Sequence, residues 1–129
     1  MAAPAMSHND ALTPYCPVFQ SAVELIGRRW TGAIVRSMLC GSLRFSDILH
    51  NVPGLSDRLL SERLRELEAQ GIVSRTVYPE TPVRIEYALT EKGTELQEIV
   101  LALSGWASRW GREAKPSCES AAACPGDLA

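Results

Sequence analysis

The sequence predicts an α+β domain that is mainly α-helical, and three observations support this prediction. Apolar residues recur at helical spacing through the first half of the chain and again near its end. After Gly71 the apolar period changes from 3.6 to 2, which indicates a pair of strands. Two helical segments joined by the short turn 52–54 directly precede those strands. This order describes a winged helix-turn-helix with a two-stranded wing.

The first two predicted helices lie on either side of Gly27. The first follows the flexible start of the chain and ends at Gly27, and the second ends at Gly41. Both have apolar residues three or four positions apart, which is the spacing of one helix face. These positions are Val18 or Phe19, Ala22, Val23 and Ile26 in the first helix, and Trp30, Ile34 and Met38 in the second.

The predicted helix-turn-helix follows Gly41. Residues 42–44 are expected to form a short strand, and residues 46–50 a short helix. Ser56 is a good N-cap for the next helix, which runs from Asp57 to Gln70 and ends at Gly71. One apolar stripe of this helix faces the core, and it consists of Leu60, Leu64 and Leu67.

The predicted wing consists of two strands, Ile72–Tyr78 and Val83–Leu89, which are rich in Val, Ile, Tyr and Thr. Two prolines in residues 79–82 suit a hairpin tip, because proline cannot donate to a strand ladder. Thr90 then caps a long final helix. Its apolar positions are Leu96, Ile99, Val100, Leu103, Trp106 and Trp110.

One folded domain is expected over residues 15–112 of this 129-residue chain, between a flexible N-terminal segment, 1–14, and a flexible tail, 113–129. No apolar stretch approaches the roughly 20 residues that span a bilayer. The first ten residues lack the layout of a signal peptide. We therefore expect a cytoplasmic protein that makes no membrane contact.

The cysteines do not form a metal-binding or redox motif. Cys16, Cys40, Cys118 and Cys124 lie in different segments, and no Cys-x-x-Cys pair occurs. This scatter argues against structural zinc and against a disulfide framework, so we expect unbonded thiols. The chain also lacks a glycine-rich phosphate loop and a convergent set of His and acidic residues. We expect no enzymatic activity, no cofactor and no metal.

The charges are unevenly distributed along the chain. The formal net charge is −2, yet residues 27–84 hold nine arginines against six acidic residues, a local charge of +3. The segments before and after this region are acidic. Because only the local field near a phosphate steers binding, the acidic total does not exclude nucleic acid. A winged-helix module that binds only protein partners is the alternative.

Short motifs occur in order from Cys16 to about Gly111, each where the predicted elements need it. They are Cys16-Pro17-Val18, Gly27-Arg28-Arg29-Trp30, Gly41-Ser42-Leu43-Arg44-Phe45, Pro53-Gly54-Leu55-Ser56, Leu60-Ser61-Glu62-Arg63-Leu64-Arg65-Glu66-Leu67, Gly71-Ile72-Val73-Ser74-Arg75, Glu86-Tyr87-Ala88-Leu89-Thr90-Glu91-Lys92-Gly93 and Trp110-Gly111. Together they resemble the HxlR-type winged-helix regulators of bacteria, which are relatives of the MarR-type regulators. That family usually has Lys before the tryptophan, where this chain has the equally cationic Arg29.

The resemblance implies a transcriptional regulator that binds double-stranded DNA. The helix 57–70 is the candidate reader of the major groove. Away from its apolar stripe point Arg58, Ser61, Glu62 and Arg65, with the N-cap Ser56 at its start. Glu62 would accept from cytosine or pair with a neighbouring arginine, and the alternative for the whole face is a solvated, salt-bridged surface.

Other arginines are candidates for phosphate contacts, which position a protein without reading sequence. Arg28, Arg29 and Arg44 flank predicted helix ends. Arg63 falls nearer the core edge, so a phosphate contact and an internal ion pair are both open to it. At the wing, Arg84 beside the hairpin tip is the preferred contact.

The resemblance also implies a homodimer built from N- and C-terminal dimerisation helices, and two-fold symmetry would then require an inverted-repeat operator. The final helix is too apolar for a lone surface element. The candidate interface residues are Phe19, Val23, Leu103, Trp106 and Trp110. The alternative is that the two tryptophans complete the core of the monomer.

Cys16 is the candidate redox sensor. Several HxlR-type regulators look like thiol sensors with a cysteine at this Cys-Pro position, and a helix N-terminus favours the reactive thiolate. The alternative is a small apolar residue at the dimer interface. Cys118 and Cys124 are candidate resolving thiols, and the effector would be an oxidant or a small aromatic molecule held between the terminal helices and the winged domain.

Overall fold

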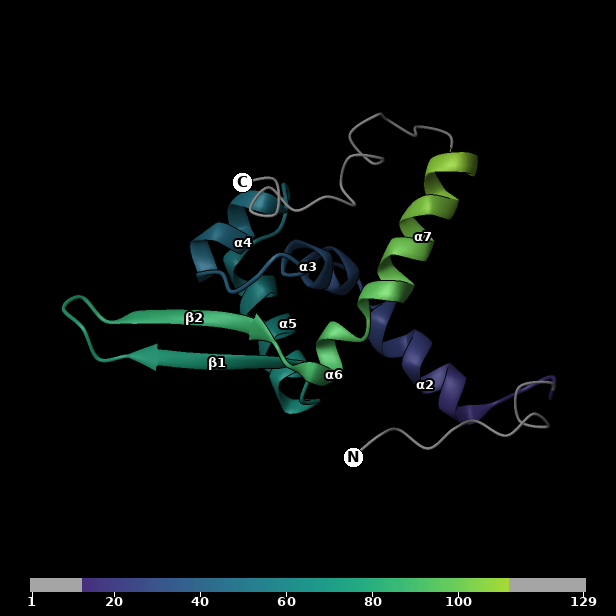
Figure 1. Ribbon diagram of the computed structural model, residues 1–129, viewed down its shortest axis with the longest axis horizontal. Helices are drawn as coiled ribbons and strands as arrows, with labels where there is room; N and C mark the ends of the chain where they lie inside the picture. The colour runs from purple at the N-terminus through teal and green to yellow at the C-terminus, as the bar shows by residue number, and fades with distance from the viewer. Residues whose placement is uncertain (1–12, 112–129) are drawn as a thin grey trace.

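The computed structural model describes residues 13–111, and its helices and strands follow the predicted order (Figure 1). Residues 1–12 and 112–129 lie outside the described residues, and with them Cys118, Cys124, the predicted flexible tail 113–129 and all but two residues of the predicted flexible segment 1–14. The elements are α2 (Pro17–Ile26), α3 (Thr31–Ser37), α4 (Phe45–Asn51), α5 (Asp57–Ala69), β1 (Val73–Tyr78), β2 (Arg84–Leu89), α6 (Glu91–Thr94) and α7 (Gln97–Trp110). The prediction of a mainly helical winged helix-turn-helix is confirmed.

The core lies between α3, α4, α5 and the base of the hairpin. The predicted stripe of α5 is buried, since Leu60, Leu64 and Leu67 are each almost inaccessible to solvent. Ser56 is the N-cap of this helix, and its Oγ accepts from the backbone N–H of Leu59 at 3.2 Å. The other members of the core cluster are Ile34, Val35, Met38, Ile48, Val52, Leu55, Ile72, Val73 and Val100.

The wing is an antiparallel hairpin in which Val73 pairs with Leu89 and Tyr78 pairs with Arg84. In Figure 1 the hairpin projects away from the helices. The strand predicted at 42–44 is reduced to one bridge, in which Leu43 and Tyr87 exchange two backbone hydrogen bonds of 2.8 Å. This bridge attaches the segment before α4 to the base of the wing.

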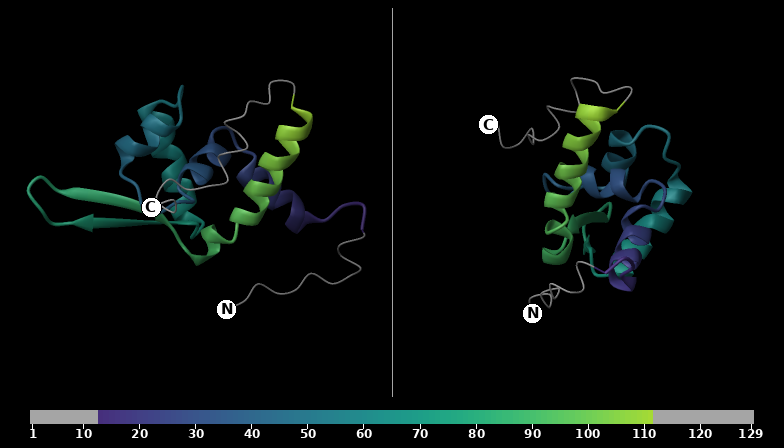
Figure 2. Two further views of the ribbon diagram at one scale, coloured as in Figure 1. Left: turned by 45° about the horizontal axis from the view of Figure 1, so that its top comes forward. Right: turned by 90° about the vertical axis from the view of Figure 1, so that its right-hand side faces the viewer.

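The single long final helix predicted after Thr90 is wrong in one respect, because the structure divides it into α6 and α7. Thr90 caps the short α6, where its Oγ1 accepts from the backbone N–H of Gly93 at 3.1 Å. Gly93 packs against the backbone carbonyl of Ile72, where no side chain would fit. This docking fixes the first turn on the wing, and α7 then leaves along the outside of the domain (Figure 2).

The terminal helices contribute little to the core. No residue of α2 is buried, and Val100 is the buried residue of α7. Both helices lie on the side of the domain opposite the hairpin tip (Figures 1 and 2). None of the helices within residues 13–111 is long and apolar enough to cross a membrane.

The cysteines depart from the expectation of unbonded thiols at one position. Cys40 lies exposed just after α3 and is disulfide-bonded, whereas Cys16 is a free thiol. The expectation was wrong for Cys40 because sequence spacing does not show that an exposed thiol lies within reach of another. Within the described part of the chain, no group of three or more His, Cys, Asp or Glu residues is placed to hold a metal ion.

Candidate nucleic-acid interface

The outer face of α5 carries the polar residues that the apolar stripe leaves outside. Arg58 and Arg65 are exposed, and Ser61 and Glu62 are partly exposed between them. Glu62 pairs with Arg58 across one helical turn at 3.6 Å. This pair holds Arg58 only weakly, because the arginine side chain is 91% exposed and water screens the attraction. Arg58 is therefore accessible to an external acceptor.

The N-cap of α5 has a local structural role. The Ser56 hydroxyl accepts a backbone hydrogen bond at the start of the helix, so one of its two lone pairs is occupied. The Ser56 residue is exposed, and its O–H remains able to donate. A hydroxyl at this position could thus cap the helix and contact a phosphate at the same time.

Arg63 lies inside the protein and makes internal contacts. Its Nε donates to the backbone carbonyl oxygen of Arg29 at 2.9 Å, and its Nη1 lies 3.3 Å from Oε2 of Glu66. Of the two roles left open for Arg63 by the sequence, the structure shows the internal ion pair. The same Glu66 oxygen lies 3.2 Å from Nη2 of Arg28, so one carboxylate joins two arginines.

The loop between α2 and α3 is held by a partly buried ring as well as by Arg63. Trp30 has a positive φ of 75°, which is uncommon for a bulky residue. Its indole lies against Gly54, in the turn of the helix-turn-helix, and the guanidinium of Arg29 lies 5.3 Å from the centre of the ring. The loop that carries Arg28 and Arg29 is thus anchored both to α5 and to the turn before it.

Arg84 is held along the wing. Its guanidinium lies 2.9 Å from a Glu80 oxygen, 2.8 Å from a Glu86 oxygen and 4.0 Å from the centre of the Tyr78 ring. Ser42 donates to the other Glu86 oxygen at 3.3 Å and connects this group to the segment before α4. Two carboxylates therefore surround the arginine that the sequence identified as the preferred wing contact.

Four further arginines are exposed and form no ion pair with any residue in the 13–111 range: Arg44, Arg65, Arg75 and Arg109. Arg44 precedes α4, and its backbone N–H donates to Asp47 at 3.0 Å. Arg75 lies on β1. No carboxylate of the described residues offsets their charges, so they add a positive field on the same domain as the outer face of α5.

The predicted dimer residues are all exposed in the single chain. Trp106 is 56% exposed and Trp110 is 72% exposed, so neither completes the core of the monomer. Seven of the ten large exposed apolar residues of the described chain lie on α2 and α7. These seven, here called the terminal-helix surface, are Val18, Phe19, Val23, Ile99, Leu103, Trp106 and Trp110.

Cys16 is the N-cap residue of α2, immediately before Pro17, and its side chain is partly buried. It lies at one end of the terminal-helix surface, next to the exposed Tyr15 and close in sequence to Val18. A free thiol at a helix start is accessible to an oxidant or an electrophile.

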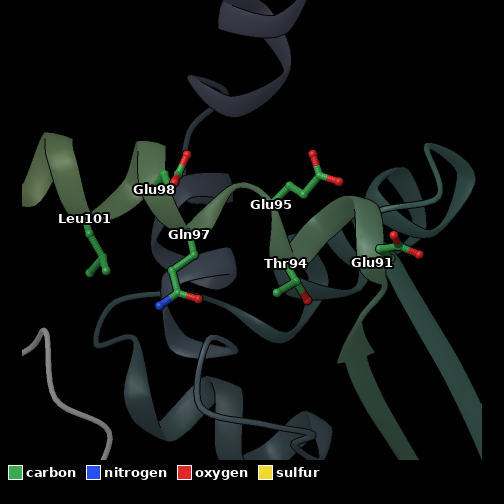
Figure 3. A pocket seen from close by; sticks show the side chains of 6 residues that line it. All are labelled: Glu91, Thr94, Glu95, Gln97, Glu98 and Leu101. Carbon is green, nitrogen blue, oxygen red and sulfur yellow. The ribbon is translucent and has the colours of Figure 1, made fainter. Parts of the chain in front are cut away.

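An open hollow lies along α6 and α7 (Figure 3). Three of its lining residues are glutamates, and its other lining residues are Thr94, Gln97 and Leu101. Its acidic lining repels a phosphate backbone and does not suit an apolar aromatic ligand. The predicted ligand crevice between the terminal helices and the winged domain is therefore not this hollow.

Sequence reasoning singled out most of the charged residues above but missed the acidic partners. Glu66, Glu80 and Glu86 were not identified as partners of arginines. The spacing offered a signal for Glu66, which follows Arg63 by three residues and so lies on the same helix face. The spacing also gave a weaker signal for the ion pair of Glu86, which follows Arg84 by two residues on the same face of a strand.

Comparison with protein families and with known proteins relates the chain to transcription regulators. Residues 25–115 match the family model described as HxlR-like helix-turn-helix. The HTH-type transcriptional regulator YvaP of Bacillus subtilis (strain 168) is 54% identical over 95 residues, which are 74% of this chain and 88% of that protein. YodB of the same organism is 43% identical over 104 residues, covering 81% of this chain and 93% of YodB.

Solved structures have the same fold. The reduced form of the B. subtilis transcriptional regulator YodB matches with a TM-score of 0.68 and 42% identity, covering 78% of this chain and 99% of that one. The redox regulator HypR in its oxidized form matches with a TM-score of 0.68 and 40% identity, covering 73% and 96% of the two chains. YodB has also been solved after diamide treatment and with a bound quinone.

Proposed function

Because the chain belongs to the HxlR-like helix-turn-helix family of transcription regulators, we propose that it is a cytoplasmic homodimer that binds an inverted-repeat operator in double-stranded DNA. The observation that carries this proposal is the outer face of α5. There Arg58, Ser61 and Arg65 point away from a buried apolar stripe, next to a two-stranded wing. A helix of this kind fits the major groove, where arginine can pair with guanine through two hydrogen bonds.

The phosphate contacts are proposed on both sides of α5. Arg28 and Arg29 lie on a loop anchored to that helix, and Arg44 is the N-cap residue of α4. The exposed Ser56 hydroxyl adds a donor at the helix start. Glu62 remains a candidate for cytosine, since its pair with Arg58 is exposed and easily exchanged. Arg84 would need to exchange a carboxylate for a phosphate in order to contact DNA.

The homodimer is supported by the terminal-helix surface. The apolar area that α2 and α7 expose is unfavourable in water and is typical of an interaction site. Phe19 and Val23 on α2, with Leu103 on α7, lie in this area together with the two tryptophans. A two-fold dimer would place two copies of α5 about one DNA turn apart, which requires an inverted repeat.

Control by a thiol-reactive effector is proposed at Cys16. Its support is the free, partly buried thiol at the start of α2, beside the proposed dimer surface. The relative HypR is described as a redox regulator, and YodB has been solved in a quinone-bound form. Modification at this position would change the packing of α2 and with it the spacing of the two reading helices.

Electrophoretic shift over a salt series, with the DNA upstream of the chain's own gene, tests DNA reading. We expect tight binding by the wild-type protein, footprinted over an inverted repeat and lost in Arg58→Ala. Arg109→Ala is the matched control, since it removes an exposed arginine near the end of α7 and should not alter binding. If the folded protein binds neither this DNA nor a random pool at low salt, the proposal fails and a protein-binding module is favoured.

A further inference from the structure

Three charged side chains, here called the Glu66 cluster, connect α5 to the loop before α3. Glu66 Oε2 lies 3.3 Å from Nη1 of Arg63 and 3.2 Å from Nη2 of Arg28. Arg63 also donates to the Arg29 carbonyl oxygen, which fixes its guanidinium from a second side. One carboxylate is therefore shared by two arginines that are 35 positions apart in the chain.

Burial differs strongly within the Glu66 cluster. The side chain of Arg63 is 9% exposed, that of Glu66 is 34% exposed and that of Arg28 is 54% exposed. Only Arg28 is thus well placed to meet a molecule outside the protein. Arg63 could reach a phosphate only if it gave up its ion pair with Glu66 and its hydrogen bond to the part-buried Arg29 carbonyl.

The charges of the cluster sum to +1, and this surplus lies on its outermost member. If Arg63 were uncharged, Glu66 would pair with Arg28 alone and the two would cancel. An arginine whose charge is cancelled by a neighbouring carboxylate attracts phosphate weakly. The charge of the buried Arg63 therefore determines how strongly the exposed Arg28 attracts a phosphate.

We propose that Arg63 is a positioning residue that does not contact DNA, and that its charge offsets Glu66 so that Arg28 can bind a phosphate. This inference rests on the proposed DNA-binding function and deepens it. It removes Arg63 from the set of direct DNA contacts suggested by the sequence. It also states why Arg28 keeps its positive charge available to a phosphate although it is paired with Glu66.

A double-mutant cycle on the full chain tests the proposal with a random-sequence DNA duplex, because non-specific binding depends almost entirely on phosphate contacts. Arg63→Met should weaken binding roughly tenfold and lower the slope of log K against log salt by about 0.9 per protomer. Adding Glu66→Gln should return binding to within about threefold of wild type, since Arg28 is then no longer neutralised. Glu66→Gln alone should change wild-type binding by less than about threefold.

Arg65→Met provides the matched control, because Arg65 is an exposed arginine two residues further along the same helix, without an ion pair to the described residues. Glu66→Gln should not rescue this variant more than it improves the wild type. A purely structural role of Arg63 would change the unfolding temperature, but removal of the Glu66 charge would not selectively restore DNA binding.

The outcomes separate the inference from the function on which it rests. If wild-type protein binds the duplex and Glu66→Gln changes the DNA-binding constant by the same factor in the wild type and in Arg63→Met, the inference is overturned. The DNA-binding function then stands. If folded wild-type protein does not bind DNA at low salt, both fail. Should Arg63→Met not fold, as judged by circular dichroism, Arg63→Gln takes its place in the cycle, since it retains a donor for the Arg29 carbonyl.

Discussion

At the scale of single residues, Trp30 and Gly54 determine how the helix-turn-helix joins the loop that carries Arg28 and Arg29. Gly54 has a φ of +92°, and a Cβ there would lie 3.3 Å from the Trp30 ring. Glycine is therefore needed both for its backbone conformation and for the close approach of the indole. The pair holds the turn before α5 against the loop that follows α2.

Gly54→Ala should lower the free energy of unfolding by more than Gly71→Ala. Both glycines have positive φ, which costs an L-residue about 1–2 kcal/mol, but a Cβ at Gly71 would meet no atom within 4 Å. The difference between the two variants measures the contact with Trp30. Urea denaturation followed by circular dichroism provides the values, and equal losses would show that the ring yields freely.

Cys16 is the second residue whose chemistry is open to a direct test. Treatment with a quinone or diamide should alter DNA binding by the wild-type protein, because an adduct or disulfide at the start of α2 changes its packing. Cys16→Ser should bind DNA normally and lose this response, as measured by electrophoretic shift. Cys40→Ser is the comparison variant, and a response that persists in Cys16→Ser would locate the sensor at another position.

At the scale of elements, the wing shows how local pairing changes the expected role of an arginine. The sequence predicted two strands and a proline-rich tip, and the structure confirms both strands, with β1 and β2 shorter by one residue at their starts. The sequence did not predict that the hairpin tip and the strand would supply two carboxylates to Arg84. Arg84 is partly buried, and its guanidinium is paired with two carboxylates.

We expect Arg84→Met to lower the salt dependence of DNA binding by much less than Arg58→Met. Arg58 should account for about 0.9 of the slope per protomer, because the arginine side chain of its one ion pair is 91% exposed. The charge of Arg84 is already offset by Glu80 and Glu86. Filter binding to a random-sequence duplex between low and moderate salt measures both slopes, and equal decreases would show that Arg84 releases its carboxylates on DNA.

At the scale of the whole molecule, apolar side chains are divided between an internal core and an exposed surface. The core cluster joins α3, α4, α5 and the wing, whereas the terminal-helix surface remains in water in a single chain. Burying an exposed tryptophan contributes about 25 cal/mol for each Å² of apolar area removed from water. A second copy of the chain would supply the missing contacts.

Trp106→Ser combined with Trp110→Ser should raise the dissociation constant of the dimer by more than about tenfold, through loss of buried apolar area. Sedimentation equilibrium should give the wild-type protein twice the mass of one chain. The mass of the variant should shift toward that of a single chain. Val77→Ser is the control, since it removes an exposed apolar residue from the wing. A wild-type protein that sediments as a monomer at all concentrations would contradict the proposed homodimer.

The sequence by itself determined the order and type of the elements, the cap at Ser56 and the inward stripe of α5, because these depend on residues within one or two helical turns. The tertiary structure alone decided the internal pairing of Arg63 and the division of the last helix at α6. Both depend on contacts between distant segments: Arg63 meets the Arg29 carbonyl 34 residues away, and Gly93 docks on Ile72. Local periodicity contains no information on such pairings, which arise only when the packed helices and the wing bring those segments together.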